Sequence, residues 1–434
     1  MRTDPSDHPC YAPFGQLYLV PREHLDLRFC PYHQSVLIRD QKELFRKGIT
    51  ELDALLNDHK SLKIRREAFL NGDYLHGAGC SPQCYWYQTW REGGRSYRSD
   101  DYLGNDGRYR VRRIWLSLGP DCNLTCRYCL EPKHFHINYK TCSPAAINLA
   151  RDLVLRGSNV LLTGGEPFLP KFGLLETFRE LANSGQRESQ GRFDIQTNGI
   201  YLNHDVRRLL LQAPISGIGI SMDTLRPDIF EYLRRGASFE KVWDNARSLV
   251  RERNAAGLQE PSVTILCAVM RANCDHLAET IDRVVAEGMD ISLNVLFKAY
   301  FSPDFSRDQS VSNLSLKEMY RLAASLDRIS KQYGDDGPVK SQAFRGQLAH
   351  IIEQKRRGDV TQVILGTREI NTPGKTLREG NMGAAAREWK AALARKFRMS
   401  GEAMRKGSVI ELIKGGHLLA AAEKAIRLAR RILL

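Results

Sequence analysis

The chain has 434 residues, of which 42% are hydrophobic, so it is long enough for a sizeable core and for two or three domains. No apolar run approaches the roughly 20 residues of a membrane-spanning helix, and the N-terminus lacks the pattern of a signal peptide, so the sequence predicts a cytoplasmic protein. The net charge of +14 is uneven: residues 371–434 hold 14 Lys and Arg against 5 Glu, which accounts for +9.

Residues 1–105 contain scattered cysteines and aromatics with few periodic runs, and the Gly- and Asp-rich stretch at 92–107 is typical of a linker. Beyond it, strand-like runs alternate with segments of helical spacing. The six runs are RIWLSL, NVLLT, FDIQT, GIGIS, VTILCAV and ISLNVLF, between Arg113 and Phe297. Six strand–helix units in a row predict an α/β fold with a parallel sheet, either doubly wound or a barrel.

A further helix is predicted over 315–333, and residues 336–434 are predicted to form a basic helical extension. In its last segment, HLLAAAEKAIRLARRILL, apolar residues recur every three or four positions while Lys and Arg occupy the others. The simplest interpretation is a solvated amphipathic helix. Contact with an anionic membrane surface or an acidic partner is the alternative.

Three cysteines lie within eight residues, in the segment CNLTCRYC. Cys122, Cys126 and Cys129 follow the first predicted strand, at the strand end that carries function in parallel α/β folds. Clustered thiolates suit zinc or an iron–sulfur cluster, and a structural zinc would need a fourth ligand. Asp121, His134 and His136 are near enough in sequence to supply one.

A second motif, GGEP, ends the second predicted strand at Gly164, Gly165, Glu166 and Pro167. With the CX3CX2C spacing and the aromatic Tyr128 before the third cysteine, the chain resembles the radical S-adenosylmethionine (SAM) superfamily over roughly residues 110–300. The resemblance implies a partial (β/α)6 TIM-like barrel over 106–335 and a [4Fe–4S] cluster held by the three cysteines, with SAM completing the ligands of the fourth iron.

The same resemblance implies SAM contacts at further positions. The predicted contact residues are Tyr128, Gly164, Gly165, Glu166, Pro167, Thr197, Asn198, Ser221, Asp223 and Arg234, with Arg235 as a second candidate for the arginine. Reductive cleavage of SAM would give a 5′-deoxyadenosyl radical that abstracts hydrogen from the substrate, with the electron supplied by a donor such as flavodoxin or ferredoxin. No catalytic side chain is assigned.

Four cysteines also lie upstream, at Cys10, Cys30, Cys80 and Cys84. Residues 1–105 resemble the SPASM module, which carries auxiliary clusters, although that module commonly follows the barrel rather than preceding it. The resemblance implies that these four cysteines hold one auxiliary [4Fe–4S] cluster. Buried structural cysteines are the alternative, and Cys267, inside an apolar strand, is predicted to be such a core residue.

The function predicted from this resemblance is hydrogen abstraction from a peptide or protein substrate. A sugar or aminoglycoside epimerase or dehydrogenase of the same superfamily is the alternative. A zinc-stabilised nucleic-acid-binding protein is a third hypothesis, disfavoured because the excess charge lies in the cysteine-free tail, away from every predicted metal ligand.

Overall fold

The structure is a computed structural model that describes residues 7–8, 10, 12–21, 25–28, 36–38, 41–74, 97–129, 144–296 and 303–357. Its centre is a ten-stranded sheet in the order β12-β11-β10-β9-β8-β7-β6-β2-β3-β4. The strands are β2 (Gln16–Pro21), β3 (Leu25–Arg28), β4 (Val36–Ile38), β6 (Arg113–Ser117), β7 (Asn159–Thr163), β8 (Phe193–Thr197), β9 (Ile215–Ser221), β10 (Ser262–Val269), β11 (Asp290–Val295) and β12 (Val339–Lys340). A separate antiparallel pair joins β1 (Asp7–His8) to β5 (Tyr97–Arg98).

Helices connect these strands and cover the sheet. The α-helices are α1 (Ala12–Gly15), α2 (Gln41–Lys47), α3 (Ile49–Asp58), α4 (Lys60–Leu70), α6 (Pro144–Leu155), α7 (Leu174–Asn183), α8 (His204–Leu210), α9 (Pro227–Leu233), α10 (Phe239–Ala255), α11 (Leu277–Ala286), α12 (Pro303–Gln309), α13 (Leu316–Tyr333) and α14 (Gln342–Arg356). Short 3-10 turns are η1 (Ser99–Tyr102), η2 (Pro170–Phe172), η3 (Gln186–Glu188), η4 (Cys274–His276) and η5 (Val311–Asn313). None of these described helices is long and apolar enough to cross a membrane.

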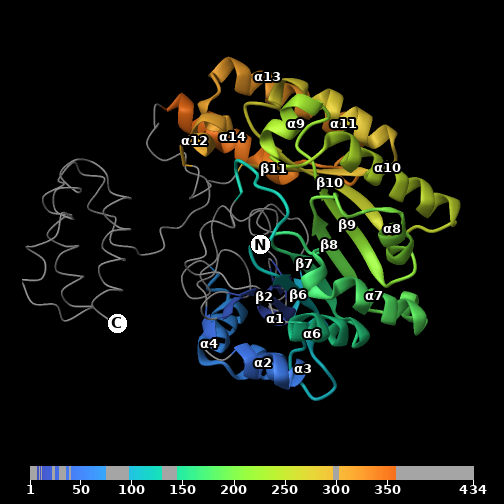
Figure 1. Ribbon diagram of the computed structural model, residues 1–434. Coiled ribbons are helices and arrows are strands. Elements are labelled where there is room, and N and C mark those ends of the chain that lie inside the picture. The colour runs from blue at the N-terminus through green and yellow to red at the C-terminus, as the bar shows by residue number, and fades with distance from the viewer. Residues whose placement is uncertain are drawn as a thin grey trace, which may run out of the picture. The chain divides into compact units, whose positions relative to one another are not determined.

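The predicted α/β fold is confirmed, and the six predicted strands correspond to β6–β11. From β6 to β12 each strand lies parallel to the next one in the chain, without the reversal of order that a doubly wound sheet requires. This order is that of a barrel, and Figure 1 shows the connecting helices following one another along the strands. The sheet is not closed among the described residues, since β12 and β4 are its two ends.

The core lies between the strands and these helices. In β10 every second residue is fully buried, from Val263 through Ile265 and Cys267 to Val269, as expected for a strand with one face against helices. The prediction that Cys267 is a core residue is therefore confirmed. The helix predicted over 315–333 is α13, which begins with a capping box between Ser315 and Glu318.

The N-terminal residues extend the same sheet. Strand β2 lies parallel to β6, with Tyr18 opposite Trp115, and β3 and β4 add two antiparallel strands. The aromatic rings of Tyr18 and Trp115 stack at 4.8 Å between centroids. Strands β2, β3 and β4, which lie within the predicted auxiliary module, thus belong to the same sheet as the barrel strands.

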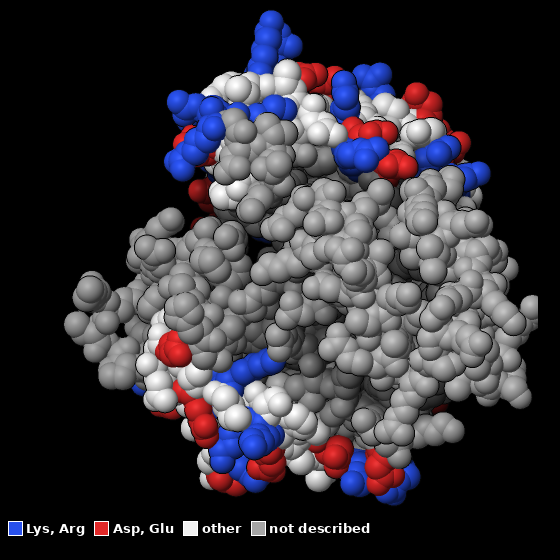
Figure 2. Space-filling model, turned by 90° about the vertical axis from the view of Figure 1, so that its left-hand side faces the viewer, with Lys and Arg blue, Asp and Glu red and all other residues white. Residues whose placement is uncertain are grey.

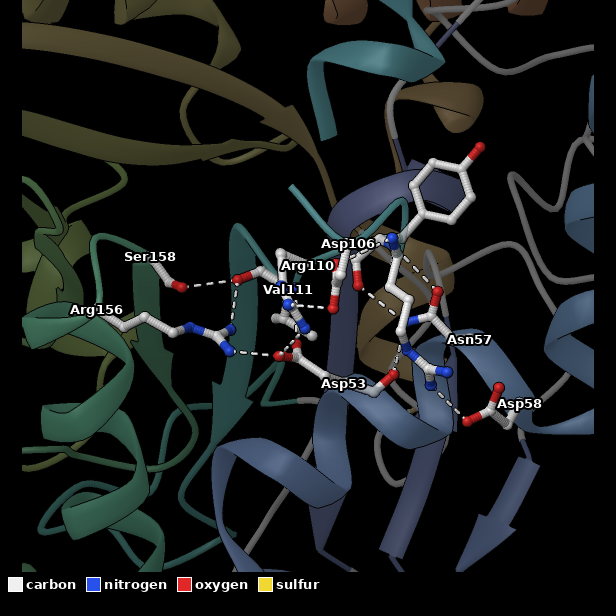
Figure 3. Close-up of polar contacts among 10 residues, drawn as sticks. Asp53, Asn57, Asp58, Asp106, Arg110, Val111, Arg156 and Ser158 are labelled. Atoms are coloured by element: carbon white, nitrogen blue, oxygen red, sulfur yellow. Dashed lines mark hydrogen bonds and ion pairs between the residues drawn. The ribbon is translucent and has the colours of Figure 1, made fainter. Parts of the chain in front are cut away.

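Asp53 of α3 fastens the N-terminal helices to the segment that leads into β6. Its carboxylate accepts hydrogen bonds from the Val111 backbone N–H at 3.1 Å, from Arg156 at 2.6 Å and from Arg110 at 3.4 Å. Figure 3 shows these groups converging on Asp53, with Asn57 and Asp58 on the same helix bonding the same segment. The stretch predicted as a linker is thus held, from residue 97 on, by turns and side-chain bonds.

Charge is mixed on the described surface. Figure 2 shows basic and acidic side chains interspersed on the face in view. Ion pairs such as Arg345–Asp327 at 3.3 Å and Arg307–Asp304 at 2.8 Å are typical of this surface. The predicted basic helix near the C-terminus lies outside the described residues.

We predict that Asp53→Ala destabilises the fold by about 3 kcal/mol, because it leaves two arginines and a backbone N–H without their buried acceptor. Asp58→Ala is the matched control on the same helix. Asp58 pairs with Arg108 at an exposed position, so its loss is expected to cost less than about 1 kcal/mol. Urea unfolding of both variants checks the difference, and equal destabilisation would show that Asp53 is not the fastening residue.

Candidate active site at the carboxyl ends of the strands

The predicted site residues gather at one edge of the sheet. The cysteine loop follows β6, GGEP follows β7, Thr197 and Asn198 lie at the end of β8, and Ser221 and Asp223 lie at the end of β9. Since these strands are parallel and adjacent, their carboxyl ends meet. The structure therefore brings together the residues that the sequence patterns separate by up to about a hundred positions.

The two glycines of GGEP pack against the backbone that leads into the cysteine loop. Gly165 donates its N–H to the Gly119 carbonyl at 2.6 Å, and Glu166 donates to the Asp121 carbonyl at 2.8 Å. A Cβ at Gly165 would lie 1.9 Å from the Asp121 oxygen, and Gly164 has a φ of +127°. Glycine is needed here for the contact between two loops, in addition to any approach to a ligand.

Glu166 is fully buried, and its carboxylate is engaged with the end of β8. It accepts hydrogen bonds from Thr197 Oγ1 at 2.8 Å, from the Asn198 N–H at 2.8 Å and from the Phe168 N–H at 3.1 Å. Burial raises the pKa of Glu166 to about 7, against the opposing effect of these donors. This side chain therefore joins the ends of β7 and β8.

Asn198 connects β8 to the first cysteine. Its amide nitrogen lies 2.8 Å from Asn123 Oδ1 and 3.7 Å from the Cys122 sulfur, which also accepts the Leu124 N–H at 3.4 Å. Burial raises the thiol pKa of Cys122 and of Cys126. N–H donors to sulfur favour the thiolate that metal ligation requires.

The cysteine loop lies against the end of α9 and the residues that follow it. Thr125 donates its N–H to the Arg235 carbonyl at 3.0 Å, and Arg127 donates to the Leu233 carbonyl at 2.9 Å. The Arg127 guanidinium also stands over the Tyr232 ring, 4.1 Å from its centroid. The loop is thus fixed on the side of β9 as well as on the side of β7.

Arg234 and Asp223 form a buried ion pair beside this loop. Arg234 Nε lies 2.9 Å and Nη2 3.2 Å from the two Asp223 oxygens, and the Tyr128 hydroxyl donates to Asp223 Oδ2. Burial raises the pKa of the Tyr128 hydroxyl well above its usual value, so Tyr128 is the donor. Ser221 ends β9 half-buried, and Pro167 is buried.

A family model for the radical SAM superfamily matches residues 116–284. This range begins within β6 and ends within α11, so it includes the cysteine loop, GGEP and the ends of β8 and β9. The chain carries a radical SAM domain. The prediction of an enzyme is confirmed. The radical SAM domain explains the cysteine loop in place of the hypothesis of a zinc-stabilised nucleic-acid-binding protein.

Two curated relatives share part of this sequence. A GTP 3',8-cyclase of Peptoclostridium acidaminophilum is 34% identical over 154 residues, which cover 34% of this chain and 44% of the relative. The molybdenum cofactor biosynthesis protein 1 of Bos taurus is 30% identical over 249 residues, which cover 54% of this chain and 36% of the relative. The chain therefore spans less than half the length of either relative.

One similar solved structure is described as native anSMEcpe with bound AdoMet. It is 17% identical, with 52% of this chain and 64% of that chain covered and a TM-score of 0.40. A likeness of this size is too slight to bear on function.

The prediction of a peptide or protein substrate is wrong. The relatives are named for GTP and for molybdenum cofactor biosynthesis, so the predicted peptide, protein or sugar partner is corrected as well. The physical reason is that CX3CX2C and GGEP, on which the prediction depended, were predicted to serve the cofactors and not the substrate. Neither motif contains residues that distinguish one substrate from another.

The radical SAM domain accounts for two of the predicted cofactors, SAM and a [4Fe–4S] cluster. Within the described ranges, no three His, Cys, Asp or Glu side chains converge as they would around a single metal ion. A cubane distributes its protein ligands over separate irons, so three half-buried thiols on one loop fit it without such convergence. The buried N–H donors to Cys122 sulfur agree with that fit.

Most of the predicted ligands of the auxiliary cluster lie outside the described residues. Cys10 is half-buried and packs against the core and the Phe14–Phe69 aromatic cluster. Cys30, Cys80 and Cys84 lie outside the described residues, as do His134 and His136. The auxiliary cluster and its SPASM-like module therefore stay predictions.

Some residues of the site escaped the sequence patterns. Lys171 of η2 pairs with Asp121 at 2.6 Å, and Asn273 donates its amide to the Asp223 carbonyl at 2.7 Å. Neither residue belongs to a motif. Of the site residues that belong to no motif, only Asn123 could have been found from the sequence, because it directly follows the first cysteine of the loop.

We predict that Gly165→Ala disrupts the site, because its methyl group would lie inside contact distance of the Asp121 carbonyl. The variant is expected to melt at a lower temperature and to lose most of the iron bound after anaerobic reconstitution. Gly346→Ala is the control, since a Cβ there meets nothing within 4 Å in α14. Normal iron binding by Gly165→Ala would contradict the importance of this contact.

We predict a pH dependence from Glu166, whose pKa of about 7 in the fold compares with about 4.3 in an unfolded chain. Between these values the unfolded chain releases the proton while the folded protein keeps it, so stability falls as pH rises through this window and levels off above it. The expected loss is about 3 kcal/mol relative to Glu166→Gln. Urea unfolding of both proteins at about pH 5 and about pH 8 measures it; parallel profiles would contradict the shift.

Proposed function

We propose that this chain is a radical SAM enzyme that acts on a nucleotide, with GTP as the first candidate substrate. The observation that carries the proposal is the 34% identity over 154 residues to a protein named GTP 3',8-cyclase. The relative named for molybdenum cofactor biosynthesis supports the same small-molecule class. Because the chain covers less than half of either relative, the substrate is proposed for this chain and has to be tested on it.

Within this proposal, Cys122, Cys126 and Cys129 hold the [4Fe–4S] cluster. Support comes from their place on one loop at the strand ends and from the N–H donors around the Cys122 sulfur. When bound, the cluster and SAM would supply the one-electron cleavage of the carbon–sulfur bond of SAM and the abstraction of a hydrogen atom from the substrate.

The residues proposed to contact SAM act by binding and orientation. We propose for this role Tyr128, Gly164, Gly165, Glu166, Pro167, Thr197, Asn198, Ser221, Asp223 and Arg234. For Glu166 the proposed action is indirect, because its carboxylate already accepts three hydrogen bonds and orients the end of β8. The buried Arg234–Asp223 pair is proposed to orient the side of the site nearest the cysteine loop.

We further propose an auxiliary [4Fe–4S] cluster on Cys10, Cys30, Cys80 and Cys84, in a SPASM-like module over residues 1–105 ahead of the barrel (106–335) and the extension (336–434). Anaerobic reconstitution tests it. Two cubanes correspond to about eight irons per chain and one cubane to about four. A Cys80→Ala/Cys84→Ala protein that binds as much iron as the wild type would overturn it.

We also propose a cytoplasmic location, since clustered cysteines used as metal ligands suit a reducing compartment.

The substrate proposal predicts GTP-dependent turnover. Reconstituted protein with SAM and a strong reductant is expected to release 5′-deoxyadenosine faster when GTP is added, with loss of GTP followed by chromatography. ATP is the matched control nucleotide. Cys126→Ala is expected to abolish both reactions, whereas Cys274→Ala, outside the cysteine loop, is expected to leave them unchanged.

Two outcomes would overturn parts of this proposal separately. Release of 5′-deoxyadenosine without any effect of GTP would remove the substrate and leave the enzyme class. No release by a protein with its full iron content would remove the enzyme function itself.

A further inference from the structure

Cys126 lies directly opposite Arg234. The residues on either side of Cys126, Thr125 and Arg127, donate their N–H groups to the carbonyls on either side of Arg234. These two bonds, Thr125 to Arg235 and Arg127 to Leu233, hold the cysteine loop against the end of α9. The Arg234 side chain lies within hydrogen-bonding reach of the Cys126 sulfur.

The Arg234 guanidinium cannot swing away from this position, because Asp223 holds it by two bonds. The pair is nearly removed from water, with side-chain exposures of 10% for Arg234 and 0% for Asp223. A bidentate pair fixes the plane of the guanidinium as well as its charge.

Asp223 is in turn anchored to the end of β10. Its Oδ1 accepts the Ala268 N–H at 3.0 Å, and its backbone carbonyl accepts the Asn273 amide at 2.7 Å and the Cys267 thiol at 3.3 Å. Asn273 also bonds the Ala268 carbonyl and receives the Met270 N–H, so it is fixed from both sides. Asp223, which follows β9, is therefore tied to strand β10 and to the turn after it.

Tyr128 connects the same anchor to the other end of the cysteine loop. Its hydroxyl donates to Asp223 Oδ2, and its ring lies beneath the Arg234 guanidinium at 5.4 Å from the centroid. Tyr128 immediately precedes Cys129. Asp223 thus restrains the surroundings of two of the three cysteines through two different side chains.

We propose that Arg234 is a positioning residue for the iron–sulfur site, held by Asp223 so that a fixed, desolvated positive charge faces Cys126. This inference rests on the proposed function, because it assumes that Cys126 is a cluster ligand. A fixed cation beside a ligand sulfur favours the more negative, reduced state of a bound cluster, so it raises the reduction potential. The hydrogen bond from Tyr128 to Asp223 also helps to hold the cysteine loop in its conformation.

The test compares Arg234→Gln with Arg235→Gln. Both variants remove one positive charge from neighbouring positions, but Arg235 is exposed, whereas Arg234 is buried. After anaerobic reconstitution, iron content is measured, and the cluster is titrated without SAM or substrate while its reduced state is followed by electron paramagnetic resonance. Arg234→Gln is expected to shift the potential to more negative values or to lose bound iron, and Arg235→Gln is expected to match the wild type.

Folding of each variant is checked by thermal melting of the iron-free protein. If Arg234→Gln does not fold because Asp223 is left unpaired, Arg234→Lys decides: it keeps a cation for Asp223 but lacks the planar fork, so a smaller shift in the same direction is expected. A folded Arg234 variant with wild-type iron content and potential would overturn the inference. A wild-type protein that binds no cluster would instead overturn the proposed function.

Discussion

The site depends on the approach of two backbones, at Gly165 and Asp121. The two hydrogen bonds between the loops that follow β7 and β6 fix the start of the cysteine loop relative to GGEP. Further connections reach the cysteine loop from other elements, among them Asn198 from β8, and Arg234 and Asp223 from the region after β9. The loop is thus held from both sides, and its thiols are partly buried before any cofactor is considered.

Much of the fold could be predicted from the sequence because the strands of the barrel have one face in the core. In VTILCAV, for example, the alternate residues Val263, Ile265 and Cys267 are buried. This burial of one face is the reason why the segment has the apolar composition from which a strand is predicted. Strand β2 and helices α2–α4 were not predicted. Their sequences are less periodic, and their positions depend on tertiary partners, such as the pairing of β2 with β6 and the bonds of Asp53.

For the site, the sequence indicated which residues matter better than how they act. Glu166 and Arg234 stand in motifs, but a motif does not reveal that each is bonded to protein groups in the fold. Asn273 and Lys171 have no motif at all, since their roles exist only after distant strand ends have met. The same limit explains the wrong substrate prediction, because cofactor motifs are shared by enzymes that act on different molecules.

The parallel pairing of β2 with β6 protects the first strand of the barrel. The cysteine loop follows strand β6. Strand β2 hydrogen-bonds to the edge of β6 that faces away from β7. A chain shortened to begin after residue 105 would turn β6 into an edge strand with unpaired N–H and C=O groups. Such an edge is a template for association with other chains. The N-terminal residues thus shield the first strand of the barrel from intermolecular pairing.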